Sequence, residues 1–329
     1  MKRKVVTALL SGVLAVSMVS AASVGVMAEE TEAVTEAAAE ETEAAEEEEA
    51  YTGDAFLDNP RNQDEIGETE LLVVSFGTSF NDNRRETIGA IEADMEAAFE
   101  DYAVRRAFTA QIVIDHVKTR DGEVIDNVTE ALDRAVANGV KTLVVQPTHL
   151  MNGIEYDELQ DTLAGYADAF EKIVVGEPLL TSEEDFKTVE TAITDATAEY
   201  DDGTTAIVYM GHGTEHESNA VYAKMQEMLT ADGFENYYIG TVEAEPSLDD
   251  VVAAIGEGEY TKVVLLPLMV VAGDHANNDM ASDEADSWKT TFEEAGYEVE
   301  AVLQGLGQNE AIREVYVQHA QAAIDSLAE

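Results

Sequence analysis

The stretches Leu143-Val-Val-Gln-Pro-Thr-His149 and Ala206-Ile-Val-Tyr-Met-Gly-His212 are short apolar runs, each followed by a histidine. Runs of this length are typical of buried β-strands, and longer amphipathic segments alternate with similar runs from Leu71 to the C-terminus. Such alternation is typical of βα units around a parallel sheet, so the predicted fold class is α/β.

The pattern predicts two similar lobes, residues 71–200 and 201–329, each a four-stranded parallel sheet flanked by helices. The expected strands are 71–76, 104–110, 141–147 and 172–176, then 205–210, 236–241, 261–268 and 298–303. The expected helices are 82–100, 122–138, 155–170 and 183–199, then 217–231, 247–256, 280–295 and 308–327. Two facing lobes would form a cleft, which is a common place for a ligand.

Residues 1–28 have the pattern of an export signal, with Lys2-Arg3-Lys4, an apolar run, and Val26-Met27-Ala28 before Glu29. Removal after Ala28 would leave a mature protein without a membrane-spanning segment, in the periplasm or outside the cell. Residues 29–70 are polar and acidic, and we interpret them as a disordered tether. A helical stalk is the alternative.

Composition excludes several classes of function. The formal net charge of -51 disfavours nucleic acid and anionic membranes as partners. The chain has no cysteine, so disulfides, thiolate metal ligands and a cysteine nucleophile are ruled out. No phosphate-binding Gly-rich loop occurs, so a nucleotide cofactor has no support. A Gly-x-Ser-x-Gly elbow is also absent, which leaves a hydrolase with His212 as base only as a weak alternative.

Four side chains that can bind a metal follow predicted strands: His149, Glu177, His212 and His275. Ligands bind outside the carboxyl ends of strands in open parallel sheets. If the two lobes face each other, His149, Glu177 and His212 could converge on one ion, and this donor set suits divalent Co, Ni, Fe or Zn. The alternative is that each is a polar residue bonded to nearby backbone.

Six bases lie close together in the sequence and could clamp an anionic ligand. Ordinary charge pairing explains them equally well. They are Arg84, Arg85, Arg105, Arg106, Lys118 and Arg120. Two further histidines are interpreted as peripheral, His116 in a loop and His319 on the last helix.

Several motifs together resemble the anaerobic sirohydrochlorin cobaltochelatases of the CbiK type. They are Leu71-Leu-Val-Val-Ser-Phe-Gly-Thr-Ser79, Arg106-Ala-Phe-Thr109, Asn152-Gly-x-Glu155-Tyr156, Met210-Gly-His-Gly213 and Pro267-Leu-Met-Val-Val-Ala-Gly-Asp-His275-Ala-x-Asn-Asp-Met-Ala-Ser-Asp283. The resemblance runs from Leu71 to the C-terminus. It implies a class II chelatase with two flavodoxin-like lobes, which inserts Co(II) into sirohydrochlorin without ATP during cobalamin synthesis.

The resemblance also implies roles for individual residues. It places the metal-binding and catalytic histidines at His149 and His212, with Glu177 as the additional carboxylate ligand of exported members. His275, Arg84 and Arg85 are expected at the cleft. Cobalt would be the substrate metal, with Fe(II) or Ni(II) as alternatives, and the tetrapyrrole sirohydrochlorin the partner.

An export signal fits poorly with a cytoplasmic pathway, so a second hypothesis stays open. The protein could bind a metal ion or a tetrapyrrole such as haem outside the cytoplasm, for uptake or for delivery to a transporter. Whether it forms a homo-oligomer is also open.

Overall fold

Strand β1 (Thr69–Ser75) lies inside the first of two parallel sheets in this computed structural model, which describes residues 52–328. Its neighbours are β2 (Ala103–Phe108) and β3 (Thr142–Pro147), and β4 (Lys172–Val175) completes the order β2-β1-β3-β4. Six of the seven residues of β1 are buried, because helices cover both faces of the sheet.

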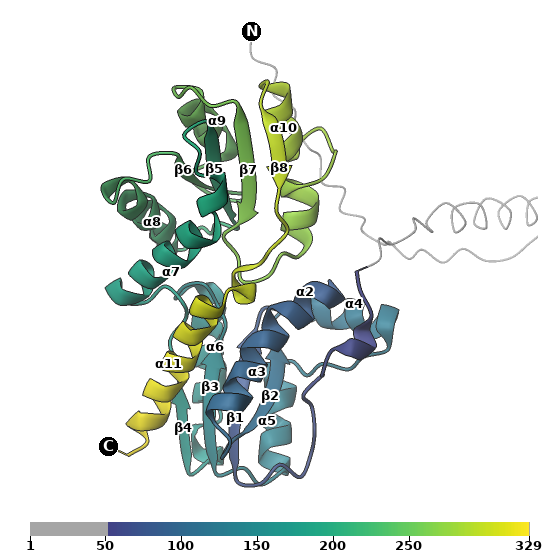
Figure 1. The fold of residues 1–329 in the computed structure, drawn as a ribbon. Helices are drawn as coiled ribbons and strands as arrows, with labels where there is room; N and C mark the ends of the chain where they lie inside the picture. The colour runs from purple at the N-terminus through teal and green to yellow at the C-terminus, as the bar shows by residue number, and fades with distance from the viewer. Residues whose placement is uncertain (1–51, 329) are drawn as a thin grey trace, which may run out of the picture. The chain divides into compact units, whose positions relative to one another are not determined.

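The second sheet repeats this topology in the order β6-β5-β7-β8 (Figure 1). Its strands are β5 (Thr205–Gly211), β6 (Tyr237–Thr241), β7 (Lys262–Pro267) and β8 (Glu298–Ala301). The predicted fold class, two lobes that each contain a four-stranded parallel sheet, is confirmed.

The helices of each lobe follow its strands. In the first lobe these are α2 (Asn81–Glu86), α3 (Ile88–Ala98), α4 (Gln111–Asp121), α5 (Val128–Ala137) and α6 (Ile154–Ala164). In the second they are α8 (Ala220–Ala231), α9 (Leu248–Ile255) and α10 (Trp288–Glu294), with a π-helical turn at Ala276–Met280. Short 3-10 turns lie at Ala55–Leu57, Ala167–Ala169, Ala198–Tyr200, Glu217–Asn219 and Leu306–Gln308.

Two predicted helices are wrong at their starts. The expected helix 280–295 begins only at Trp288, because residues 276–280 form the π-helical turn. The expected helix 122–138 begins only at Val128, where Asn127 and Glu130 form a capping box. The preceding residues 111–121 form α4, which ends at Gly122 in the left-handed conformation. His116 therefore lies on a helix and not in a loop.

Two long helices join the lobes. Helix α11 (Glu310–Ser326) ends the chain but packs against α3, α7, β3 and β4 of the first half. Helix α7 (Glu183–Ala196) contacts both α11 and α8. The largest apolar core joins both sheets and includes Val73, Tyr209 and Tyr316. The predicted boundary between residues 200 and 201 thus divides the sheets but not the helices that cover them.

Residues 52–70, part of the predicted disordered tether, have defined contacts with the first lobe. Asp58 accepts hydrogen bonds from Arg84 and Arg106, and the buried Arg61 pairs with Glu92. The amide of Gln63 donates to the carbonyl of Val104. This part of the tether prediction is wrong, because acids in the segment neutralise arginines of the core. The predicted export signal and residues 29–51 lie outside the described residues.

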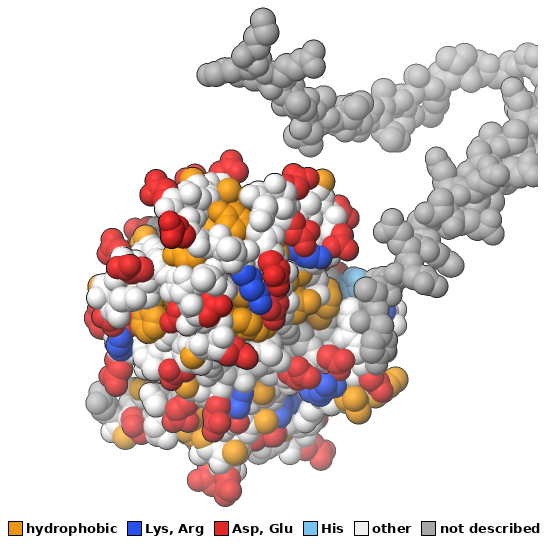
Figure 2. Space-filling view, turned by 45° about the horizontal axis from the view of Figure 1, so that its top comes forward, with side chains coloured by type: hydrophobic (Ala, Val, Ile, Leu, Met, Phe, Trp, Pro, Cys, Tyr) orange, Lys and Arg blue, Asp and Glu red, His pale blue; other side chains and the backbone are white. Residues whose placement is uncertain are grey.

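Within residues 52–328, no helix has the length and apolar character needed to cross a membrane. Acidic side chains are spread over the face shown in Figure 2, where cations are fewer.

Candidate metal and macrocycle site

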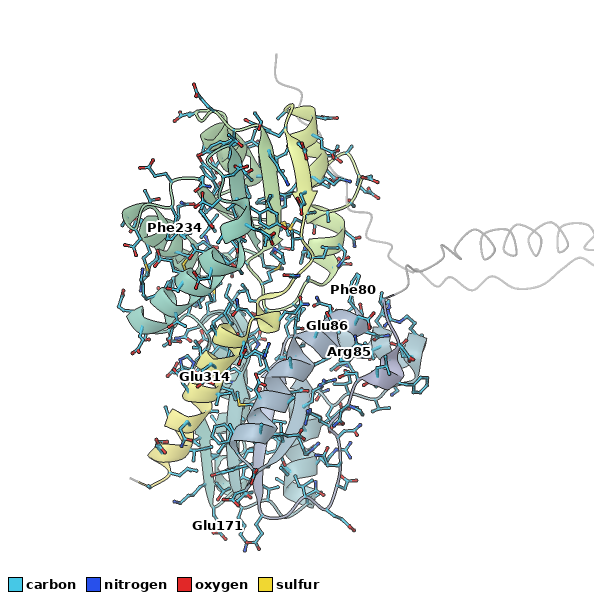
Figure 3. All side chains as sticks on the ribbon, viewed as in Figure 1. Phe80, Arg85, Glu86, Glu171, Phe234 and Glu314 are labelled. Atoms are coloured by element: carbon cyan, nitrogen blue, oxygen red, sulfur yellow. The ribbon has the colours of Figure 1, made fainter. Side chains whose placement is uncertain are left out.

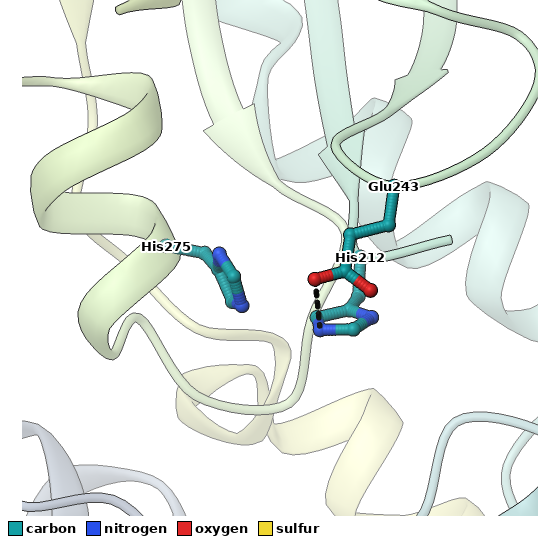
Figure 4. A group of neighbouring side chains, drawn as sticks. All are labelled: His212, Glu243 and His275. Atoms are coloured by element: carbon teal, nitrogen blue, oxygen red, sulfur yellow. Dashed lines mark ion pairs between the residues drawn. The ribbon is translucent and has the colours of Figure 1, made fainter. Parts of the chain in front are cut away.

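His212, Glu243 and His275 come together at the carboxyl ends of three adjacent strands of the second sheet (Figure 4). His212 directly follows β5, Glu243 lies two residues beyond β6, and His275 lies in the loop after β7. One potential ligand atom from each side chain lies within 4.8 Å of the others. The parallel sheet thus places two imidazoles and a carboxylate where they could hold one divalent ion.

The hydrogen bonds of the two imidazoles prepare them for this role. Nδ1 of His212 is 2.8 Å from the carbonyl oxygen of Gly213, and Nδ1 of His275 is 2.6 Å from Oδ2 of Asp279. Carbonyl and carboxylate oxygens accept, so the tautomer that fits carries the proton on Nδ1 and leaves Nε2 as the nitrogen that can bind a metal. Nε2 of His212 lies 3.9 Å from Oε1 of Glu243.

Local backbone structure holds these rings in place. Gly213 has φ +85°, and a Cβ there would lie 2.8 Å from the backbone nitrogen of Ala244. Glycine therefore permits the sharp turn directly after His212. His275 immediately precedes the π-helical turn, whose Asn277 amide donates to the carbonyl of Gly273 at 2.7 Å.

His149 approaches from the first lobe and has a different environment. The residue as a whole is half-buried, but both of its ring nitrogens are buried and have no hydrogen-bond partner among the described residues. Burial lowers the pKa of His149 to about 4, so the ring is neutral at physiological pH. Buried polar atoms without a partner are rare, and a neutral imidazole in this state is suited to a metal or a transferred proton.

A cavity of about 480 Å³ connects the two groups. His149 lines it from the first lobe, and His212 and His275 line it from the second. Apolar side chains such as Phe76 and Ile154 form much of its wall. Its size and mainly apolar lining are typical of a site for an organic ligand.

The predicted ligand Glu177 has a different position. It is exposed, does not line this cavity, and lies outside the group formed by His212, Glu243 and His275. Its backbone carbonyl accepts from Gln146 and lies 2.9 Å from Nδ1 of His319. The ligand set His149, Glu177 and His212 stays a prediction.

The predicted clamp arginines do not line the cavity. Arg84, Arg105 and Arg106 are fully buried and pair with acids of the first lobe. Arg84 donates to the backbone carbonyl of Thr78, which belongs to a loop that lines the cavity. Arg84 therefore holds this loop in place without facing the cavity. Arg85 is partly exposed on α2, near Glu86 (Figure 3). It forms ion pairs with Asp82 and Glu86. The interpretation of Arg84 as a cleft residue is wrong, because its charge is already neutralised inside the protein.

Sequence reasoning missed Glu243 and Asp279. Glu243 ends the run Ile239-Gly-Thr-Val-Glu243, so the strand-end rule that selected the histidines could also have found it. Asp279 is four residues after His275, a spacing that places side chains on one face of a helical turn.

Two parallel sheets with histidines at strand ends on both sides of one cavity are the architecture of a two-lobed metal chelatase. The fold is similar to that of SirB from Bacillus subtilis with Fe3+, with TM-score 0.56 and 12% identity over 80% of this chain and 98% of that chain. The sirohydrochlorin chelatase SirB from Bacillus subtilis subspecies spizizenii in complex with cobalt gives TM-score 0.52 and 12% identity, with the same coverage. At these identities the likeness concerns the fold alone.

The chain belongs to the cobalt chelatase (CbiK) family, which it matches over residues 69–325. It is 39% identical over 259 residues to the sirohydrochlorin cobaltochelatase of Salmonella typhimurium strain LT2, covering 79% of this chain and 97% of the relative. It is 27% identical over 275 residues to the sirohydrochlorin cobaltochelatase CbiKC of Nitratidesulfovibrio vulgaris strain Hildenborough, covering 82% and 96%. The resemblance inferred from the motifs is confirmed.

Proposed function

We propose that this protein inserts Co(II) into sirohydrochlorin without a nucleotide. The observation that carries the proposal is the cavity itself, with the unpartnered ring of His149 on one side and the group His212, Glu243 and His275 on the other. Membership of the cobalt chelatase family and similarity to two sirohydrochlorin cobaltochelatases support both the metal and the macrocycle.

The chemistry requires a metal held with open coordination positions and groups that accept protons. Two pyrrole N–H protons leave the macrocycle as the divalent ion enters, so the metallated ring has the same charge as the metal-free ring and two protons pass to basic groups or to water. Nε2 of His212 and of His275, with Glu243, would present the ion. The buried neutral ring of His149 can accept a proton or bind the ion from the opposite lobe. The apolar wall limits competition from water.

The direct test is a metal-insertion assay with the mature protein, sirohydrochlorin and Co(II), followed by absorbance. We expect acceleration over the spontaneous rate, and His149→Ala and His212→Ala should each remove most of it while the circular dichroism spectrum is unchanged. The same assay with Fe(II) and Ni(II) identifies the preferred metal. Wild-type acceleration in both variants would remove these histidines from the mechanism.

The assay also separates the second hypothesis, a binding protein for a metal ion or a tetrapyrrole. That hypothesis predicts stoichiometric binding without turnover. We further propose that the protein is exported, on the basis of the signal pattern in residues 1–28. Cell fractionation with an antibody against the lobes tests this, and recovery in the cytoplasm with residues 1–28 intact would contradict it. Size-exclusion chromatography with light scattering would show whether the protein is an oligomer.

A further inference from the structure

The last helix of the chain reaches the loop that carries His149. Helix α11 packs against β3 and β4 of the first sheet (Figure 1). The hydroxyl of Tyr316, a fully buried residue of this helix, donates a hydrogen bond of 2.9 Å to the backbone carbonyl of Thr148. The same hydroxyl lies 3.4 Å from the backbone carbonyl oxygen of His149. A side chain near the end of the sequence is thus bonded to the backbone of the histidine loop.

The carbonyl of Thr148 needs a donor from outside the sheet. Thr148 directly follows β3, and its N–H donates to the carbonyl of Val74 as the last bond of the ladder between β3 and β1. Thr148 is only 3% exposed, so water cannot readily take the place of a protein donor. Buried backbone groups without a partner are costly, and the Tyr316 hydroxyl removes this cost.

The same helix also contacts the loop after β4. The N–H of Leu179, in that loop, donates to the carbonyl of His149 at 3.0 Å. Nδ1 of His319, one helical turn after Tyr316, lies 2.9 Å from the carbonyl oxygen of Glu177. Helix α11 therefore holds both loops that meet at the backbone of His149.

The ring of His149 has no comparable support of its own. Neither ring nitrogen has a hydrogen-bond partner among the described residues. The place of the ring in the cavity therefore depends on the backbone that carries it, and a shift of this backbone moves the ring relative to His212 and His275 on the opposite wall. A displacement of about 1 Å at a reacting group can cost on the order of 100-fold in rate.

We infer that Tyr316 is a positioning residue, whose hydroxyl sets the place of His149 in the cavity. Tyr316 does not line the cavity, so it acts through the backbone of Thr148 and His149 and not on the metal or the macrocycle. The inference rests on the proposed function for its effect on the rate, whereas the contact can be measured without turnover.

Tyr316→Phe removes the hydroxyl and keeps the buried ring. In the metal-insertion assay kcat should fall by about tenfold, whereas KM for sirohydrochlorin should change less than about twofold, because the cavity wall is unchanged. The matched control is Tyr209→Phe. Tyr209 is buried in the same core, and its hydroxyl donates to the carbonyl of Ile193 on α7 at 3.0 Å. This variant loses a bond of the same kind that does not involve the His149 loop, so it should keep the wild-type kcat.

A double variant shows whether Tyr316 acts through the histidine. Adding Tyr316→Phe to His149→Ala should change the remaining rate by less than about twofold, because two changes that act through one group are not additive. A further loss of about tenfold in the double variant would overturn the inference. A wild-type kcat in Tyr316→Phe, or an equal loss of kcat in Tyr209→Phe, would also overturn it.

Hydrogen exchange followed by mass spectrometry examines the loop without turnover. The amides of Leu179 and Leu180 donate to the carbonyls of His149 and Leu150. They should exchange about fivefold faster in Tyr316→Phe than in the wild-type protein, and at the wild-type rate in Tyr209→Phe. Equal exchange in all three proteins would overturn the inference. If the wild-type protein does not insert cobalt but this difference in exchange is found, the proposed function fails and the inference stands.

Discussion

Oδ2 of Asp279 lies 2.6 Å from Nδ1 of His275, and the pair directs the other nitrogen of the imidazole toward the ligand group of the second lobe. A carboxylate behind a metal-binding histidine fixes the tautomer and raises the basicity of the ring. Asp279 is thus a positioning residue that need not contact the metal.

Asp279→Asn should lower the affinity for Co(II) by about 10- to 100-fold, because the amide no longer fixes the proton on Nδ1. Isothermal titration calorimetry of the metal-free protein measures this. Asp283→Asn is the control, an exposed acid of the same loop that pairs with Lys289. Wild-type affinity in Asp279→Asn would show that the pair has no part in metal binding.

Glu243 and Glu177 can be compared directly as metal ligands. Glu243→Gln should weaken Co(II) binding by roughly tenfold or more, because it removes one of three grouped donors. Glu215→Gln, an exposed acid in the loop after His212, controls for loss of negative charge alone. A loss of affinity in Glu177→Gln but not in Glu243→Gln would support the ligand set predicted from the sequence.

His149 should make stability depend on pH. Its pKa is lowered to about 4 in the folded protein, whereas an unfolded histidine titrates near 6.5. Between these values the unfolded chain binds more protons, so the free energy of unfolding falls as the pH decreases through this window, by up to ~3 kcal/mol. Urea denaturation at pH 7 and pH 4.5 measures how much the free energy of unfolding changes between these pH values. This change should be smaller for His149→Gln than for the wild-type protein. Equal differences in both proteins would contradict the buried state of the ring.

Asp58 should be among the most important charges for stability. It pairs with Arg84 and Arg106, which are both fully buried. Asp58→Asn removes one acid from this buried group and leaves Arg84 paired only with Glu123 and Arg106 only with Glu92. It should lower the free energy of unfolding by about 1–3 kcal/mol. The exposed pair of Asp82 and Arg85 offers a control, since Asp82→Asn should cost ~1 kcal/mol or less.

A truncation series tests the same contact in another way. A protein that begins at residue 52 should keep the unfolding midpoint of the longer chain. One that begins at residue 67 lacks Asp58 and Arg61 and should unfold at much lower urea concentration. Equal midpoints would show that residues 52–66 do not contribute to the fold.

The strands were predictable because both faces of each sheet are covered. Val73, Val144 and Val264 belong to continuous apolar runs that are buried throughout. Helix α4 was not predictable in this way. Only Ile114 and Val117 of this helix are buried, whereas Ile112 points its apolar side chain at the cavity. An apolar residue that faces a ligand cavity instead of the core interrupts the helical spacing of buried apolar residues, which is the pattern used to predict a helix.

Part of the site followed from the strand-end rule, which selected His149, His212 and His275. The spacing of the arginines in the sequence could not predict that they are buried and paired with acids. Arg106 is neutralised by Glu92 and by Asp58, which lies 48 residues earlier in the chain. Whether a base faces a ligand or a buried acid depends on such distant partners, and the local sequence does not contain them.

The packing of α11 on the first sheet also determines when the protein can finish folding. Ile312 and Tyr316, near the end of the chain, complete a core that begins at Leu71. The first lobe therefore lacks part of its cover until α11 has been synthesised. A first sheet covered by a helix that lies more than 130 residues beyond its last strand stays partly open while the whole second lobe is being made.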